Sequence, residues 1–192
     1  AIAVTGLLYV AAPFLVPRLI PGFSPESVAN TILLARIMLL QPILLGVSAI
    51  IASLVQASRR FVLFAMAPIL YNVGIIVGAL VLYPIMGIAG LGWGVVIGAF
   101  LHVSIQALPL LLRREQLSLS WQFAHLAATV RAVVLPSLPR SLALMGTQGL
   151  LVAFATIASV VSVGAVSAMS FAFNLQSVPL AIIGVSYALA LS

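Results

Sequence analysis

The sequence predicts an all-α integral membrane protein, a polytopic bundle of transmembrane helices. Its 8 basic and 2 acidic side chains are the only formal charges among 192 residues, whereas about a quarter of the residues in a soluble domain are charged. Hydrophobic residues make up 64% of the chain, and the mean hydropathy is +1.34. The apolar residues come in successive runs of about 20, the length of an α-helix that crosses the hydrocarbon core. We therefore expect several crossings rather than a single anchor.

Six transmembrane spans are expected when arginine, proline and glycine clusters are taken as their boundaries. They cover residues 1–20, 29–55, 61–83, 88–112, 133–161 and 165–192. No charged segment precedes the first span, so we interpret it as a transmembrane helix of a longer protein and not as a signal peptide. Pro21, Gly22 and Pro25 end that span because they break helical hydrogen bonding.

Prolines and arginines also mark the later boundaries. The second span ends at Arg59 and Arg60, and the third is expected to end in a turn over residues 83–87. Pro136 and Pro139 are expected to interrupt the fifth span, because proline removes a backbone donor.

The most polar stretch, residues 113–131, separates the fourth span from the fifth. It holds three arginines, with Trp121 and Phe123 among its polar side chains. This composition is typical of an amphipathic segment that lies in the membrane interface.

Arginines also predict the orientation. With alternating crossings, two loops on one side hold five arginines and the opposite loops hold none. The five are Arg59, Arg60, Arg113, Arg114 and Arg131. Their side is expected to be cytoplasmic, so the loop at residues 21–28 faces outward.

Five glycines are spaced for close helix packing. Gly74 and Gly78, followed by Gly90, Gly94 and Gly98, form small-xxx-small ridges that let helix backbones approach. Ordinary packing explains the ridges, and a sliding contact in a moving transporter is the alternative.

A series of apolar and turn motifs runs along the chain. The series is Pro21–Phe23, Arg36–Gly46, Arg60-Phe61, Ala67–Asn72, Gly90–Gly94 with Gln106 and Pro109, and Phe171–Pro179. In this order and spacing the motifs resemble the MurJ/MviN lipid II flippase family, over essentially the whole chain.

The resemblance implies the multidrug/oligosaccharidyl-lipid/polysaccharide exporter fold, in which two six-helix lobes surround a central cavity. The chain then corresponds to the third to eighth helices. Residues 1–112 are four helices of the N-terminal lobe, 113–131 a cytoplasmic amphipathic linker between lobes, and 132–192 the first two helices of the C-terminal lobe. The implied function is flipping of lipid II, a lipid-linked peptidoglycan precursor, from the cytoplasmic to the outer leaflet of the bacterial inner membrane. Neither enzymatic activity nor a cofactor is expected.

Five polar residues within the spans are candidate contacts for the anionic lipid-linked substrate. They are Arg36, Asn72, Arg140, Gln148 and Asn174. Arg140 either snorkels to the cytoplasmic interface or faces the cavity, where its guanidinium can bind a diphosphate bidentately. Gln148 lies eight residues later, on roughly the same helix face.

The other three candidates have alternatives of their own. By the resemblance, Asn174 occupies the position of a cavity arginine implicated in substrate binding, and Arg140 is a candidate replacement for that charge. Arg36, one or two turns into its helix, either snorkels to outer headgroups or lines the outer end of the cavity. Asn72 needs a hydrogen-bond partner at depth, which another helix or the cavity can supply.

Composition excludes several function classes. Without cysteine there is no disulfide, thiolate catalyst or Cys-ligated metal. His102 and His125 have no carboxylate neighbours at ligand spacing, and the arginines lie too close to apolar runs for nucleic-acid binding. A related polysaccharide-lipid or multidrug exporter and a non-transporting membrane scaffold stay as alternatives. Membrane lipids are expected partners in each case.

Overall fold

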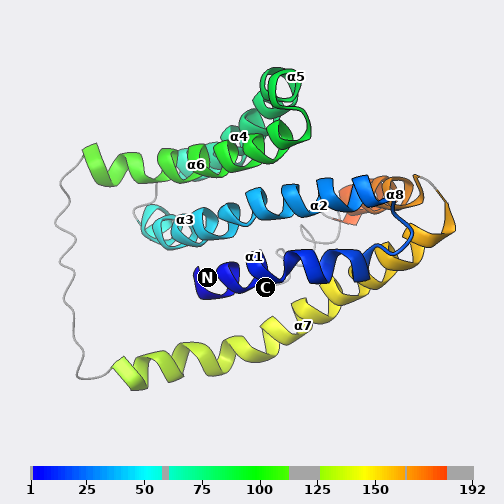
Figure 1. Cartoon of the computed structure of the whole chain (residues 1–192). Helices are drawn as coiled ribbons and strands as arrows, with labels where there is room; N and C mark the ends of the chain where they lie inside the picture. Colours follow the sequence, from blue (N-terminus) through cyan, green and yellow to red (C-terminus); the bar gives the residue numbers. More distant parts are fainter. Residues whose placement is uncertain (1, 58–60, 113–125, 163, 181–192) are drawn as a thin grey trace. The chain divides into compact units, whose positions relative to one another are not determined.

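The computed structural model describes residues 2–57, 61–112, 126–162 and 164–180, and every regular element among them is helical (Figure 1). Five stretches are long and apolar enough to cross a bilayer. They are Ile2–Leu19, Pro25–Val55, Val62–Met86, Ile88–Leu108 and Val130–Val161. The predicted class, an all-α polytopic membrane bundle, is confirmed.

Contacts divide the chain into two compact units, each described here by itself. The first unit consists of Ala1–Val16 and Pro25–Trp121, and the second of Pro17–Ser24 and Gln122–Ser192. In chain order the helices are α1 (Ile2–Leu19), α2 (Pro25–Met38), α3 (Leu40–Ala57), α4 (Phe61–Val77), η1 (Gly78–Leu82), α5 (Tyr83–Met86), α6 (Ile88–Leu112), α7 (Leu126–Val161) and α8 (Ala165–Pro179). Helix α6 is central to the first unit, since it contacts α2, α3, α4 and η1.

The second span consists of two helices, α2 and α3, with a break at Leu39. Pro42 explains the break, because it has no N–H to donate to Met38, four residues earlier. The Leu39 N–H still bonds to the Ala35 carbonyl at 3.0 Å, and Pro25–Val55 forms one continuous apolar stretch. Pro42 therefore interrupts the helix without ending the span.

The third span stays helical through α5, and the chain reverses only at Gly87, so the turn predicted over residues 83–87 is wrong. Pro84 lacks an N–H, but the preceding element η1 is a π-helix, in which the Tyr83 N–H bonds to the Gly78 carbonyl five residues back. This wider turn accommodates the proline, and the helix continues. Gly87 then reverses the chain at a φ of 60°, which glycine adopts at little cost.

Helix α6 packs against α4 and η1 through a row of glycines that we call the glycine seam. Gly74 lies against Gly98, and Gly78 against Gly94, four residues apart on each helix. Gly90 extends the seam against the end of η1. A methyl group on Gly78 would lie 2.5 Å from the Cα of Gly94, closer than folded proteins allow. The close approach predicted from the small-xxx-small ridges is confirmed.

Helix α7 is one continuous helix of 36 residues, so the interruption predicted at Pro136 and Pro139 is wrong. A broken helix in lipid leaves many backbone groups without partners, whereas each proline removes only its own donated bond. The helix begins at Leu126, so residues 126–131 of the predicted interfacial segment belong to it. Residues 113–125 of that segment lie outside the described residues.

In the second unit, α8 follows α7 after a short turn and packs on it. The rings of Phe154 and Phe173 join the two helices, with centroids 6.3 Å apart. The loop before α2 reaches the same end of α7, where Gly22 contacts the backbone of Ser159; a methyl group there would lie 2.9 Å from the Cα of Val160. The described part of the sixth span ends near Pro179, and residues 181–192 lie outside the described residues.

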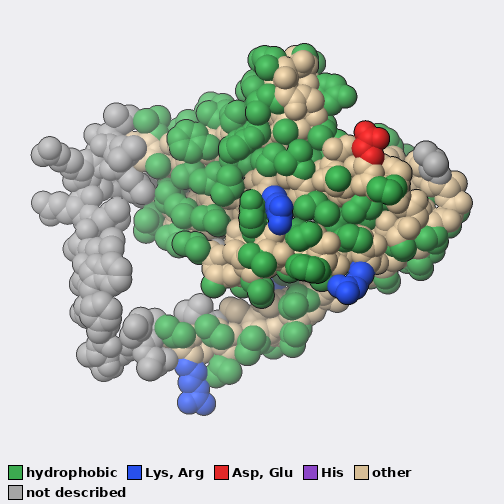
Figure 2. Space-filling model, viewed as in Figure 1, with side chains coloured by type: hydrophobic (Ala, Val, Ile, Leu, Met, Phe, Trp, Pro, Cys, Tyr) green, Lys and Arg blue, Asp and Glu red, His purple; other side chains and the backbone are tan. Residues whose placement is uncertain are grey.

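The face of the described helices seen in Figure 2 is rich in apolar side chains, with basic side chains isolated among them. Leu142 is 65% exposed and Phe171 is 74% exposed, values that suit contact with lipid rather than water. Fully buried side chains gather in the first unit, where Val55, Ala67 and Ala99 are at most 1% exposed. The rigid packing of the protein therefore centres on α3, α4 and α6.

The glycine seam generates a matched pair of substitutions. Gly78→Ala in the full-length protein should lower its stability by about 1–3 kcal/mol, because the new methyl group meets the α6 backbone. Gly46 on α3 has nothing within 4 Å of the same methyl position, so Gly46→Ala should stabilise by up to about 1 kcal/mol through helix propensity. Thermal unfolding in detergent measures both changes. Shifts of the same sign would contradict close packing at the seam.

Candidate functional site

Arg36 lies deep along α2 in the first unit. It follows Pro25, the first residue of α2, by eleven residues, which places its Cα about 16 Å along the helix axis. This is three turns into the helix, deeper than the one or two turns expected from the sequence. The side chain is half-buried. A cation at such depth is stable only beside protein groups, water or an anion.

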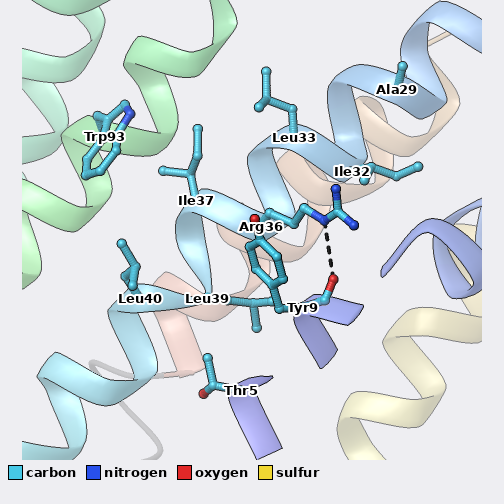
Figure 3. Close-up of a pocket in the computed structure, with 10 residues that line it drawn as sticks. All are labelled: Thr5, Tyr9, Ala29, Ile32, Leu33, Arg36, Ile37, Leu39, Leu40 and Trp93. Atoms are coloured by element: carbon cyan, nitrogen blue, oxygen red, sulfur yellow. Dashed lines mark hydrogen bonds between the residues drawn. The ribbon is translucent and has the colours of Figure 1, made fainter. Parts of the chain in front are cut away.

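Tyr9 on α1 holds Arg36 through two contacts. The Arg36 Nε donates a hydrogen bond to the Tyr9 carbonyl at 3.3 Å, and the guanidinium carbon lies 4.8 Å from the centre of the Tyr9 ring (Figure 3). The second contact is a cation–π interaction. The carbonyl is free to accept because the residue four positions later is Pro13, which has no N–H to bond it. Pro13 thus leaves the Tyr9 carbonyl free to accept the hydrogen bond that orients Arg36.

Arg36 and Tyr9 line a pocket of about 450 Å³, which we call the Arg36 pocket. Its lining residues are Thr5, Tyr9, Ala29, Ile32, Leu33, Arg36, Ile37, Leu39, Leu40 and Trp93 (Figure 3). Arg36 is the one charged residue among them, and most of the others are apolar. A concave, mostly apolar site with a single convergent charge suits an anionic amphiphile.

No carboxylate of the described residues neutralises Arg36. The chain has two acids, Glu26 and Glu115. Glu26 precedes Arg36 by ten residues on α2, about 15 Å along the axis and far beyond ion-pair distance. Glu115 lies outside the described residues. The terminal guanidinium nitrogens make no hydrogen bond to the described residues, so they remain available to an anion.

A second polar cluster, the α3–α6 network, lies inside the first unit. The Ser48 hydroxyl donates to Gln106 Oε1 at 2.9 Å and lies 2.8 Å from Nδ1 of His102. Gln41 donates from Nε2 to the Tyr71 hydroxyl at 2.9 Å. The Tyr71 and His102 rings meet edge to face at 6.4 Å and join the two halves.

The Ser48 hydroxyl joins Gln106 and His102. It has one hydrogen, so when it donates that hydrogen to Gln106 Oε1, the Ser48 oxygen accepts from Nδ1 of His102. Ser48 and Gln106 are each only 1% exposed. Gln41, Tyr71 and His102 are part-exposed. The burial of the Ser48–Gln106 pair favours a structural role for that pair over contact with a transported ligand.

Asn72, a candidate site residue on α4, does not join this network. Its neighbour Tyr71 turns inward, whereas Asn72 is exposed on the surface of the described helices. Successive helical residues point about 100° apart, so the two side chains serve different faces.

The remaining candidates lie in the second unit. Arg140 and Gln148 are exposed on α7, and Asn174 is exposed on α8. Phe154 packs on Phe173, so Asn174 lies level with the residue before Phe154. Arg140 is thirteen residues earlier on α7, about 20 Å along the axis. Arg140 and Asn174 therefore lie at separate levels of the second unit.

Sequence analysis missed Tyr9 and the α3–α6 network, although signals for both were present. Pro13, four residues after Tyr9, marks a carbonyl without a helical partner. Polar residues also recur on single helix faces, seven apart at Gln41 and Ser48 and four apart at His102 and Gln106.

The chain matches a known protein family. The family model described as lipid II flippase MurJ matches residues 1–191. The matched range includes residues of both compact units and every described helix. The resemblance inferred from the sequence motifs is confirmed.

The α3–α6 network predicts a non-additive pair of substitutions. Ser48→Ala should destabilise the full-length protein by about 1–3 kcal/mol, because buried Gln106 and part-exposed His102 lose their partner. Adding Gln106→Leu should cost less than the sum of the single changes, since it removes one of the stranded groups. Ser53→Ala, at an exposed hydroxyl bonded only within its own helix, is the control. Thermal unfolding in detergent is the measurement, and additive costs would mean that the groups act independently.

Proposed function

The chain belongs to the lipid II flippase MurJ family, and we propose how its residues take part in moving lipid II across the bacterial inner membrane. The family match over residues 1–191 is the observation that carries the function. Five apolar spans agree with a multi-pass transporter. The match favours the flippase over a drug exporter, a polysaccharide-lipid exporter or a scaffold.

Transport of this kind needs no covalent chemistry. The protein shields the polar diphosphate and sugar headgroup while the lipid tail stays in the bilayer, and lobes that rock about the site open it to each side in turn. In our proposal residues 1–112 belong to the first lobe, 113–131 link the lobes at the cytoplasmic face, and 132–192 begin the second lobe. The division of the chain into two compact units supports this assignment.

The exposed polar residues of the second unit form a series of levels along the proposed path. Arg140 lies fourteen residues after the start of α7, Gln148 eight residues further, and Asn174 near the level of Phe154. We assign the diphosphate contact to Arg140, because a guanidinium binds phosphate oxygens bidentately. Gln148 and Asn174, further along the α7 axis, then form uncharged hydrogen bonds with the sugars. Such bonds are weaker than those to a charged group and favour release of the substrate. In the first unit, we assign a contact with the headgroup to the exposed amide of Asn72.

The proposed orientation predicts which side of the membrane each loop occupies. Cysteines introduced at Ser24 and Ser162 of the full-length protein should react with a membrane-impermeant reagent in intact cells, because Gly22 lies against Ser159 and both loops share one end of α7. Cysteines at Ser58 and Ser118, which lie outside the described residues, should react only after permeabilisation. Labelling in the reverse pattern would overturn the orientation and the direction of transport.

Arg140 gives the direct test of the substrate path. In cells depleted of the full-length protein, lipid II should accumulate in the inner leaflet, and Arg140→Ala should fail to restore export at normal protein abundance. Loss of a hydrogen bond to a charged group costs about 1.5–3 kcal/mol, or roughly a 10- to 150-fold weaker contact. Arg140→Lys should restore part of the export because it keeps the charge but loses the planar fork.

The matched control is Arg131→Ala, because Arg131 lies in the first turns of α7, where an interfacial arginine only anchors the helix. This variant should export lipid II at the normal rate. Full export by Arg140→Ala would remove Arg140 from the path, and an unchanged lipid II distribution on depletion would overturn the flippase function.

A further inference from the structure

We propose that the Arg36 pocket is a binding site for an anionic phospholipid of the bilayer, distinct from the route of the transported substrate. The ligand chemistry is a phosphate ester that carries long apolar chains. The phosphate binds the Arg36 guanidinium, and the chains lie against the apolar lining of the pocket. The assignment of this lipid to the outer leaflet depends on the orientation that we propose above. The assignment of the pocket as a lipid site does not depend on that orientation.

Charge is the first argument. Arg36 is a half-buried cation in an apolar span, and Glu26, the one acid of the described residues, lies about 15 Å away along α2. Tyr9 satisfies only the Nε donor and one face of the guanidinium plane. The planar pair of terminal nitrogens matches two phosphate oxygens. A bound anion would therefore supply the counter-charge that the described residues do not give Arg36.

The position of the guanidinium is the second argument. Side chains on a helix lean toward its N-terminus, which for α2 is the outer end in the proposed orientation. The Arg36 head group therefore reaches toward the turn of Ile32, as Figure 3 shows. Ile32 is seven residues from the start of α2, about 10 Å along the axis. This level is close to that of a lipid phosphate drawn slightly into the outer leaflet.

The shape of the pocket is the third argument. Its lining follows α2 from Ala29 past Arg36 to Leu40 in α3, a strip of twelve residues or about 16 Å that runs inward along the span. Beyond Arg36 this strip is apolar, and Trp93 of α6 closes its side. Lipid chains run in the same direction as this strip, below the phosphate.

Size separates this ligand from the transported substrate. The pocket volume of about 450 Å³ is in the lower half of the range for drug-sized ligands, roughly 300–1,000 Å³. A phosphoglycerol head and the first part of its chains fit such a volume. A disaccharide that carries a peptide is far larger than this volume, so the pocket suits the smaller phosphoglycerol headgroup better than that of lipid II.

The first test measures lipid binding by the purified, delipidated full-length protein. Native mass spectrometry with added phosphatidylglycerol, zwitterionic phosphatidylethanolamine or undecaprenyl phosphate compares the three lipid sources. Phosphatidylglycerol should bind, and Arg36→Ala should weaken its binding roughly tenfold or more, the loss of one charge-assisted contact. Arg36→Lys should lie between the two. Unchanged phosphatidylglycerol binding by Arg36→Ala would overturn the proposal, as would preferential, Arg36-dependent binding of undecaprenyl phosphate.

The second test leaves the charge in place. Ala29→Trp fills the outer end of the pocket and should also weaken phosphatidylglycerol binding, whereas Ala49→Trp, at an exposed position of α3 outside the pocket lining, should not. Pro13→Ala restores an N–H for the Tyr9 carbonyl and should lower the affinity by releasing the Arg36 side chain. Binding unaffected by Ala29→Trp would mean that the lipid lies elsewhere.

The two proposals fail in distinguishable ways. Arg36→Ala should bind lipid II within about twofold of the normal affinity, a change of less than 0.5 kcal/mol, whereas Arg140→Ala should lose lipid II and keep phosphatidylglycerol. Loss of lipid II binding by Arg36→Ala would place the pocket on the transport route and overturn a separate phospholipid site. If Arg140→Ala bound lipid II normally while phosphatidylglycerol binding still depended on Arg36, only the proposed substrate path would be overturned.

Discussion

One constraint governs this protein: within lipid, a backbone N–H or C=O finds its hydrogen-bond partner in the protein or in a bound ligand, because the solvent offers none. Prolines test the constraint, since each removes a donor. At Pro42 the helix breaks for one residue, and before Pro84 it widens into a π-turn, while the span continues in both places. Because of Pro13, the Tyr9 carbonyl has no helical donor, and it accepts a hydrogen bond from Arg36 of another helix instead. A defect in one helix thereby positions the charged side chain of another.

The same constraint separates structural from functional polar side chains. Ser48 and Gln106 are buried and hydrogen-bonded to each other, and Ser48 also bonds to part-exposed His102, so these contacts join α3 to α6. Arg36 is satisfied only in part. The hydrophobic effect does not drive helices together within lipid. Close backbone contact at the glycine seam and the hydrogen bonds of the α3–α6 network therefore hold the first unit together. The rigid part and the binding part of this unit are therefore adjacent but distinct.

The sequence predicted the features that depend on local properties. Hydropathy and charge predicted the membrane class and the first five of the six expected spans, and four-residue spacing predicted the contact of Gly74 and Gly78 with α6. Prediction failed where two local preferences compete, as at Pro136, where the penalty for a broken helix in lipid outweighs the lost donor. It also failed where helix rotation decides the outcome. Tyr9 and Arg36 are 27 residues apart, and nothing in their spacing indicates that they meet.

The roles that we propose for the two intramembrane arginines differ, and acids are scarce around both. Glu26 and Glu115 both lie outside the predicted spans, so this chain carries its net charge of +6 with few internal counterions. Arg36 is held by Tyr9 before any ligand arrives, and such preorganisation lowers the entropy lost on binding. A preorganised cation beside a mostly apolar lining favours long residence, which suits the proposed bound lipid. Arg140 is exposed, and a carrier must bind its substrate strongly enough to capture it and weakly enough to release it. In our proposal Arg140 loses side-chain entropy each time it binds the substrate, which weakens the contact and allows release more readily than a preorganised arginine would.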